Sequence, residues 1–178
     1  MKIIYFLFPL FIATACKTQT GTVTAPEKTI MKNSNMDRKG CPSDGTCSVK
    51  VLKDKSLEIR KDETMRTIYP EIVDGNNIVV EYTYFRSGPE GTADGNYSET
   101  IQFELPAKTK DLVKQNGGLA DVKMLFGKSG YRNLEYHMVS DGKLSVQNTE
   151  NGLSFTLDFK MDKTPQVVTH INESITLR

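Results

Sequence analysis

The sequence predicts an all-β protein, an antiparallel meandering β-sandwich or flattened barrel with one short helix. Apolar and polar residues alternate in many short runs, tight-turn dipeptides separate these runs, and β-branched and aromatic residues crowd them. The chain has 178 residues, of which 38% are hydrophobic and 25% charged, a composition typical of one globular domain. We place that single β domain at residues 41–178.

The first part of the domain is predicted to hold short strands separated by turns. Strands are expected at Val49–Val51, Leu57–Ile59 and Thr64–Tyr69, and turns at Asp54-Lys55 and Asp74–Asn77. Pro70 is expected to end the third of these strands, because proline cannot donate to a ladder.

Two neighbouring runs carry the clearest strand signal. Ile78–Arg86 is rich in β-branched and aromatic residues, with Val80, Tyr82 and Tyr84 on one face. Tyr97–Leu105 alternates strictly between apolar and polar positions, apart from Glu99 on the apolar parity. Such alternation is typical of an antiparallel sheet with one buried and one solvated face.

The C-terminal half is predicted to continue as hairpins after one short helix. We expect the helix at Thr109–Gln115, strands at Val122–Phe126, Tyr131–Val139, Leu144–Val146, Leu153–Met161, Val167–Ile171 and Ser174–Leu177, and hairpin turns at Asp141-Gly142 and Asn151-Gly152. The alternation is strongest in Leu153–Met161, so that run should lie in the sheet with one face on the core.

Residues 1–15 predict a secretory signal peptide. Lys2 precedes an apolar run that is shorter than the ~20 residues needed to span a bilayer. Ala13-Thr14-Ala15 then precedes Cys16, and this order resembles the signal of bacterial lipoproteins, although Ala13 stands where that family usually has Leu. The resemblance implies cleavage before Cys16 and lipidation of that cysteine. The alternative is an ordinary secreted protein with a spare thiol.

Residues 16–40 are predicted to form the lipidated N-terminus and a flexible tether, because they are polar and show no strand or helix period. The alternative is a segment that folds on a partner. By resemblance to lipoproteins, Lys17 in place of an inner-membrane retention Asp implies the outer membrane. Surface-displayed lipoproteins of the Bacteroidota resemble one another in carrying acidic residues soon after the cysteine. The first acidic residue here is Glu27, so comparison with that family implies the periplasmic face rather than the cell surface.

Cys41 and Cys47 are predicted to form a disulfide that opens the folded domain. They bracket a Pro and an Asp-Gly turn, and an oxidising compartment favours pairing of cysteines this close. A redox pair usually has two intervening residues, and a zinc site or a thiol nucleophile needs partner residues that this segment lacks. In the chain-entropy model such a bond contributes about 2 kcal/mol.

Three short segments resemble uncharacterised small lipoproteins of flavobacteria and other Bacteroidota. They are CPSDGTCSVKV at Cys41–Val51, KSLEI at Lys55–Ile59 and VKMLFG at Val122–Gly127. The resemblance implies a location in the bacterial envelope and does not imply a particular activity.

Composition and motifs argue against several classes of function. The net charge of +1, with no basic stripe, gives no electrostatic footprint for nucleic acid. The sequence holds no serine-hydrolase, zinc-protease, P-loop or dinucleotide motif, so we expect no catalytic residues and no cofactor. Asp94-Gly95-Asn96 and Asp74–Asn77 lack the ligand spacing of a calcium loop and are interpreted as turns, which leaves no expected metal site.

Four ionisable residues are the remaining candidates for chemistry. His137 and His170 fall in predicted strands, where a histidine is usually a surface residue with a satisfied hydrogen bond. Glu99 has inward parity near a strand end, where we expect it to reach water, and Glu81 on the neighbouring strand has outward parity. We therefore do not expect them to act as the carboxylate pair of a glycosidase.

The connection Ser87–Asn96 is the expected contact surface. Tyr84, Phe85, Pro89 and Tyr97 form it, because aromatic residues beside a loop held by rigid strands can stack on sugars or anchor a protein interface. The alternative is a hairpin loop with core aromatics at its base.

These observations together lead us to expect an outer-membrane lipoprotein that acts as a non-enzymatic binding or accessory module. Its N-terminal lipid is expected to hold it to the membrane, with an envelope or outer-membrane protein as partner. The alternatives are an envelope hydrolase of glycan or peptide and a carrier with a small-ligand cavity between its sheets.

Overall fold

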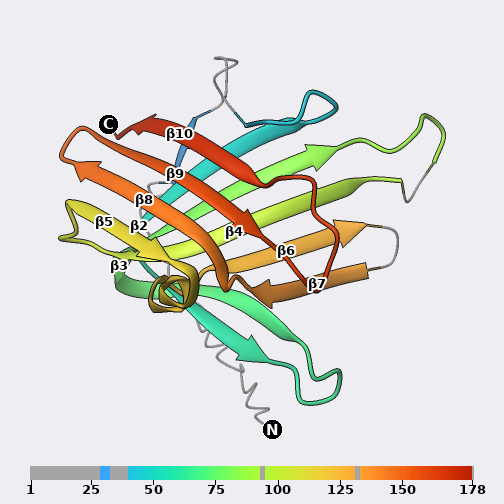
Figure 1. The fold of residues 1–178 in the computed structure, drawn as a ribbon, viewed down its shortest axis with the longest axis horizontal. Helices are drawn as coiled ribbons and strands as arrows, with labels where there is room; N and C mark the ends of the chain where they lie inside the picture. The colour runs from blue at the N-terminus through green and yellow to red at the C-terminus, as the bar shows by residue number, and fades with distance from the viewer. Residues whose placement is uncertain (1–28, 33–39, 93–94, 131–132, 178) are drawn as a thin grey trace, which may run out of the picture.

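The computed structural model describes residues 29–32, 40–92, 95–130 and 133–177, with only the backbone described for residues 29–32. In this part of the chain two antiparallel sheets pack face to face, and the four-stranded sheet lies in front in Figure 1. This arrangement confirms the predicted β-sandwich. The two sheets stay separate and do not close into the alternative barrel.

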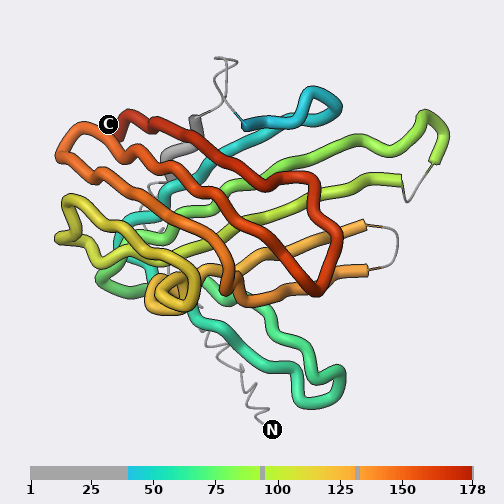
Figure 2. Tube along the Cα trace, viewed as in Figure 1, coloured from blue at the N-terminus to red at the C-terminus, as the bar shows by residue number. Residues whose placement is uncertain are grey.

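The six-stranded sheet A has the strand order β1-β2-β3-β4-β6-β7, and the four-stranded sheet B has the order β10-β9-β8-β5. The strands are β1 (Thr29–Lys32), β2 (Thr46–Lys61), β3 (Ile68–Arg86), β4 (Tyr97–Pro106), β5 (Asp111–Gln115), β6 (Leu125–Gly130), β7 (Asn133–Met138), β8 (Asp141–Thr149), β9 (Gly152–Lys160) and β10 (His170–Thr176). The chain crosses from sheet A to sheet B after β4, returns through a 3₁₀ helix (Asn116–Val122) to β6, and crosses again after β7 (Figure 2).

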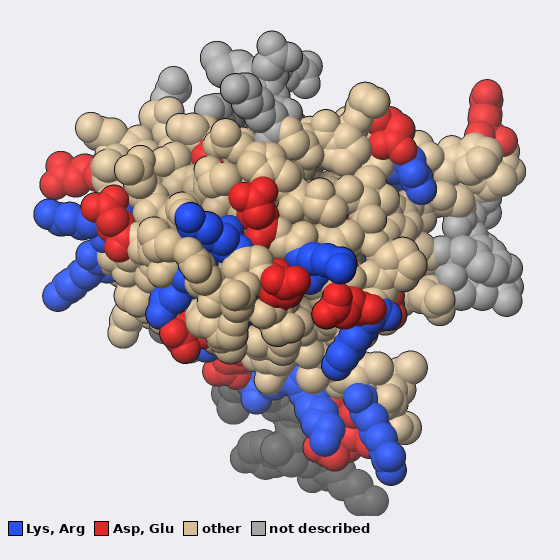
Figure 3. All heavy atoms as spheres, viewed as in Figure 1, with Lys and Arg blue, Asp and Glu red and all other residues tan. Residues whose placement is uncertain are grey.

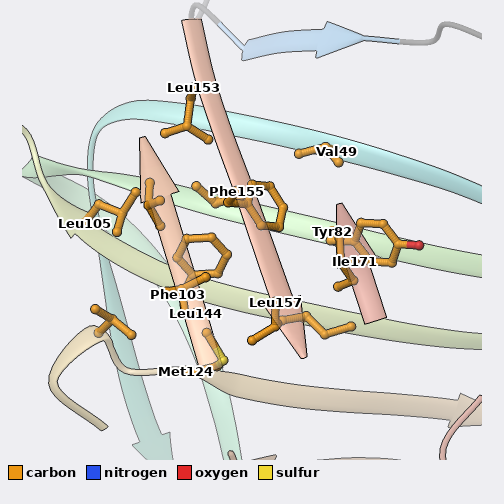
Figure 4. Close-up of a cluster of buried hydrophobic side chains, with 14 of the residues drawn as sticks. Val49, Tyr82, Phe103, Leu105, Met124, Leu144, Leu153, Phe155, Leu157 and Ile171 are labelled. Carbon is orange, nitrogen blue, oxygen red and sulfur yellow. The ribbon is translucent and has the colours of Figure 1, made fainter. Parts of the chain in front are cut away.

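The core lies between the sheets and is filled by side chains from both. Tyr82 and Phe103 point inward from sheet A, and Phe155 points inward from sheet B (Figure 4). The rings of Phe103 and Phe155 meet edge to face, with 5.3 Å between their centroids. Burial of each large side chain contributes about 1.5–3 kcal/mol, so this layer is the main source of stability.

The two cleanest alternations in the sequence are confirmed. Ile101, Phe103 and Leu105 on β4 are buried against sheet B. On β9 the inward residues are Leu153, Phe155, Leu157 and Phe159, while Ser154, Thr156 and Asp158 face away from the core. A slip by one residue would reverse these faces, so the buried apolar set fixes the register. The turn at Asn151-Gly152 joins β8 to β9, as predicted.

Two predicted turns are instead a single bend in a long hairpin. β2 runs through Asp54-Lys55 and β3 runs through Asp74–Asn77, so both turn predictions are wrong. Lys55 lies opposite both Asn77 and Asp74. The pairing of β2 with β3 is therefore shifted at this point, as in a β-bulge. Asp54 has a left-handed φ of 58°, a conformation that Asp tolerates in turns and bulges alike. The same local residues are therefore compatible with a turn and with a bulge.

Beyond the bend, residues 55–61 and 68–74 form a two-stranded ribbon, which we call the arm. The arm packs on the outer face of sheet A, where Leu57 joins Leu52 and Val79 in a second buried cluster. Glu104 on β4 accepts the Leu57 amide at 2.6 Å, and Lys123 Nζ donates to the Leu57 carbonyl at 2.8 Å. Figure 1 shows the arm crossing behind the sandwich and extending past it. The predicted strand at Thr64–Tyr69 is wrong, because the arm turns there and β3 begins at Ile68.

Three predictions in the C-terminal half are also wrong. Thr109–Gln115 is not a helix, since most of it is strand β5 and the short helix follows it. Asp141-Gly142 is not a hairpin turn, because β7 and β8 belong to different sheets. The two expected strands at the C-terminus are one strand, β10, preceded by a loop at residues 161–169.

The predicted disulfide between Cys41 and Cys47 is present. The disulfide closes a loop that contains Gly45. Gly45 lies against the ring of Tyr84, where no Cβ would fit. The loop therefore packs directly on the end of β3 and closes that end of the sandwich.

The signal peptide, Cys16 and most of the predicted tether lie outside the described residues. Within residues 16–40, however, Thr29–Lys32 form β1 and pair with Val49–Leu52 of β2, so the tether prediction is wrong for these four residues. Among the residues that the structure describes, none forms a helix with the length and apolar character needed to cross a membrane.

Candidate binding site

The predicted contact surface beside Ser87–Asn96 is divided between core and surface. Tyr84 is fully buried and its hydroxyl donates to Asp44 Oδ1 at 2.8 Å, so its assignment to a binding surface is wrong. Phe85 is 39% exposed and Pro89 is exposed, whereas Tyr97 is half-buried. Tyr84 and Tyr97 meet edge to face, which favours the alternative of core aromatics at the base of a hairpin.

Glu99 is fully buried beneath the loop at residues 161–169, so the expectation that it reaches water is wrong. Its carboxylate accepts the Tyr97 hydroxyl at 2.6 Å and the amides of Val167 and Val168 at 2.6 and 2.8 Å. Burial, together with the bond to Glu99, raises the pKa of Tyr97. The arrangement fastens the loop to sheet A.

Glu81 lies on the opposite face of sheet A, as its parity predicts. It accepts Lys50 Nζ at 3.0 Å and Gln102 Nε2 at 2.8 Å. Because Glu81 and Glu99 point to opposite faces of one sheet, they cannot flank a common glycosidic bond.

His137 lies beside a second group of polar side chains on the inner side of β6 and β7. Glu135 accepts the Thr164 hydroxyl at 2.6 Å and pairs with Lys128 at 2.9 Å. These bonds, with that from Thr164 foremost, lower the pKa of Glu135 to about 2. His137 Nε2 is 3.4 Å from Glu135 and makes no hydrogen bond within the described chain. Lys128 Nζ also donates to the Thr164 hydroxyl oxygen, so Lys128, Thr164 and Glu135 form one hydrogen-bonded group.

His170 begins β10 on the outer side of sheet B. Its Nδ1 lies 2.6 Å from Asp158 Oδ1, so the expected hydrogen bond of a surface histidine is present here. Among the described residues, no group of three or more His, Cys, Asp or Glu side chains is arranged to hold a metal ion.

A hollow lies at the opposite end of the sandwich from the disulfide. It has a volume of about 720 Å³ and is lined by the bend of the β2–β3 hairpin, the β4–β5 loop and the β8–β9 turn. Figure 1 shows these three segments at the left of the molecule. We call this hollow the end pocket. Ile78 and Leu177, both almost fully buried, give it an apolar floor.

Hydrogen bonds hold the walls of the end pocket in place. Asn148 Nδ2 donates to the Thr109 carbonyl at 2.9 Å, and the Asn148 amide donates to the Lys110 carbonyl, which fixes the β4–β5 loop to β8. The Leu177 amide donates to the Asn151 carbonyl at 2.9 Å and fixes the C-terminal segment to the β8–β9 turn. The pocket is therefore shaped before any ligand arrives.

The rim of the end pocket carries six charged side chains, three of each sign. They are Lys53, Lys108, Lys110, Asp54, Asp111 and Glu150. Within the described part of the chain none of the six makes an ion pair, although other lysines of the same domain do, such as Lys55 with Asp74. These charges remain available to a ligand that enters the pocket.

No sequence pattern predicts the end pocket, because its walls come from distant parts of the chain, Lys53 and Leu177 among them. A lysine in a turn is ordinarily a solvated surface residue, and only the fold brings these lysines around one apolar floor. Comparison of the chain with protein-family models, curated proteins and solved structures gives no match.

Proposed function

We propose that this protein is a non-enzymatic lipoprotein of the bacterial envelope whose β domain binds a zwitterionic amphiphile in the end pocket. The single observation that carries the proposal is a preformed pocket of about 720 Å³ with an apolar floor. Three lysines and three carboxylates surround that floor, and none of them makes an ion pair with another described residue. The floor suits a hydrocarbon portion, and the rim suits a head group that carries both a phosphate and an ammonium.

The balance of charges on the rim decides the class of ligand. A purely anionic ligand would approach Lys53, Lys108 and Lys110 but would meet three carboxylates at the same mouth, with like-charge repulsion. A zwitterion places each of its charges beside a partner of opposite sign. The expected ligand is therefore of the type of an aminophospholipid.

The proposed location at a bacterial membrane would place the domain beside abundant phospholipids. The order Lys2, apolar run, Ala13-Thr14-Ala15 and Cys16 supports a lipid anchor on Cys16. With more than one acyl chain, such an anchor holds the domain stably at a membrane surface.

The test of the pocket is a calorimetric titration of the domain with monomeric dihexanoylphosphatidylethanolamine, with dihexanoylphosphatidylglycerol as the purely anionic comparison. We expect binding of the first, weakened about tenfold or more, or about 1.4 kcal/mol, by the triple variant Lys53→Ala, Lys108→Ala, Lys110→Ala. The carboxylate variant Asp54→Asn, Asp111→Asn, Glu150→Gln should weaken it as well.

The matched control removes three exposed lysines away from the end pocket, Lys61, Lys160 and Lys163. Equal affinity of the control and of the pocket variant would contradict the proposal. Preference for the purely anionic lipid would contradict the zwitterionic assignment.

The anchor is tested separately by feeding an alkyne-tagged fatty acid to bacteria that express the full chain. We expect label on the wild-type protein and none on Cys16→Ser. Equal labelling of both proteins would contradict lipidation at Cys16, and absence of label from both would favour the ordinary secreted protein.

A further inference from the structure

The outer face of sheet B carries a shallow groove of about 430 Å³, separate from the core. The ladder aligns Val113, Ser145, Thr156 and Asn172 in one row across the four strands. The next row consists of Asp111, Gln147, Ser154 and Ser174. Figure 3, which views this face, shows uncharged surface between groups of blue and red side chains that also lie across it.

The groove arises from the sizes of the side chains in these two rows. The central strands β8 and β9 contribute the short residues Ser145, Ser154 and Thr156, while the edge strands and Gln147 contribute longer ones. Short side chains in the middle of a sheet leave its backbone close to the surface. The result is a trough that runs across the strands.

Five polar side chains of the groove have no side-chain hydrogen-bond partner among the described residues. Ser145, Gln147, Ser154, Thr156 and Asn172 make no side-chain hydrogen bond within the described chain. The amides on the outer face of sheet A differ in this respect. There, Gln102 donates to Glu81 at 2.8 Å and Asn77 donates to Glu104 at 2.9 Å.

We propose that this groove binds a neutral oligosaccharide. Hydroxyl and amide groups both donate and accept hydrogen bonds, and sugar hydroxyl groups do the same at short, regular intervals. Asp111 is the single charged residue that lines the described groove, so an anionic chain would find no counter-charge there. An apolar ligand would remove the hydrogen bonds that these polar groups make to water and would supply none in their place.

Two further features fit a sugar chain. Val113, 60% exposed at the edge of the groove, offers an apolar contact for the C–H face of a sugar ring. Asp111 lines both the groove and the end pocket, so the two sites adjoin. Sugar binding in the groove does not depend on the end pocket being occupied.

The test uses the full domain and NMR titration of its backbone amides with cellotriose, maltotriose and tri-N-acetylchitotriose, with trigalacturonic acid as the acidic comparison. We expect at least one neutral trisaccharide to shift amides of β8, β9 and β10. The variant Gln147→Ala, Asn172→Ala should weaken binding about tenfold. The matched control, Asn76→Ala and Asn133→Ala, removes two exposed amides elsewhere and should bind as the wild type does.

Several outcomes would overturn the proposal. These are shifts confined to other elements, equal affinity of the groove variant and its control, preference for the acidic sugar, and no shift with any neutral trisaccharide at its solubility limit. The triple lysine variant of the end pocket should keep its sugar binding, so failure of one site is distinguished from failure of the other.

Discussion

Glu99 Oε2 accepts the backbone amide of Val168 at 2.8 Å, although the two residues are 69 positions apart in the chain. This bond joins the loop at residues 161–169 to the middle of sheet A, in a place where neither group contacts water. A buried carboxylate is costly unless it is fully paired, and Glu99 has three donors around it.

The first prediction concerns that carboxylate. Glu99→Gln should lower the free energy of unfolding by about 1–3 kcal/mol, because the new amide presents donors to groups that are themselves donors. Urea denaturation measures the change. Tyr97→Phe removes one of the three hydrogen bonds, so it should lower the free energy of unfolding by less than Glu99→Gln does. Equal stability of Glu99→Gln and the wild type would show that the loop does not depend on this carboxylate.

The second prediction concerns pH. The pKa of Glu135 is lowered from 4.5 to about 2 in the folded protein, first by the hydrogen bond from Thr164 and then by that from Lys128. Because the folded-state pKa lies below the unfolded one, the ionised group stabilises the fold above pH 4.5, and this contribution is lost as the pH falls toward about 2.

The stability difference between the wild type and Glu135→Gln should therefore narrow across that range of pH. Carbon NMR of the carboxyl group should show its midpoint rising in Thr164→Val, since the largest cause of the shift is removed. A stability difference that stays constant with pH would argue against a lowered pKa.

The third prediction concerns the arm. Leu57 is fully buried in a small cluster that is separate from the main core. Leu57→Ala should release the arm while leaving the sandwich folded, because a two-stranded ribbon is only marginally stable by itself. Hydrogen exchange should speed up at residues 55–61 and 68–74. Phe155→Ala in the main core is the comparison and should speed up exchange throughout the domain. Global loss of protection in Leu57→Ala would instead make the arm part of the same cooperative unit.

The fourth prediction concerns Gly142, which follows the crossing from β7 to sheet B. Its φ of 151° lies in the region that favours glycine, and an added Cβ would collide with the backbone oxygen of Asp158. Gly142→Ala should lower the free energy of unfolding by about 1–3 kcal/mol. Gly117→Ala is the control, because a Cβ there meets nothing and restricts only the unfolded chain. Thermal or urea unfolding that ranks the two variants equally would contradict this account.

Long-range alternation in this sequence predicts the sheets well, whereas local turn signals mislead. The faces of β4 and β9 follow directly from the parity of Ile101 and Phe155, because burial on one face requires it. Asp54-Lys55 and Asp141-Gly142 have the composition of turns, yet one forms a bulge and the other a crossing between sheets. Which structure forms depends on the partner strand, which the local residues do not specify.

The candidate sites were less predictable than the fold. Parity alone places Glu99 inward and Glu81 outward, but it does not show the amides of Val167 and Val168 that cover Glu99. The end pocket and the groove of sheet B have no motif, because each is lined by residues from several separate segments that only the fold brings together.

The disulfide loop has a consequence for maturation. Cys41 and Cys47 are separated by six positions, so their pairing needs no distant part of the chain and can precede formation of the sheets. The chain has three cysteines in all, and each could pair with either of the others. On the proposal that Cys16 carries a lipid, Cys41 and Cys47 have no other cysteine of the chain to pair with. On that proposal, oxidation of the chain has one intramolecular product, so an oxidant is sufficient and no isomerase is required to correct it.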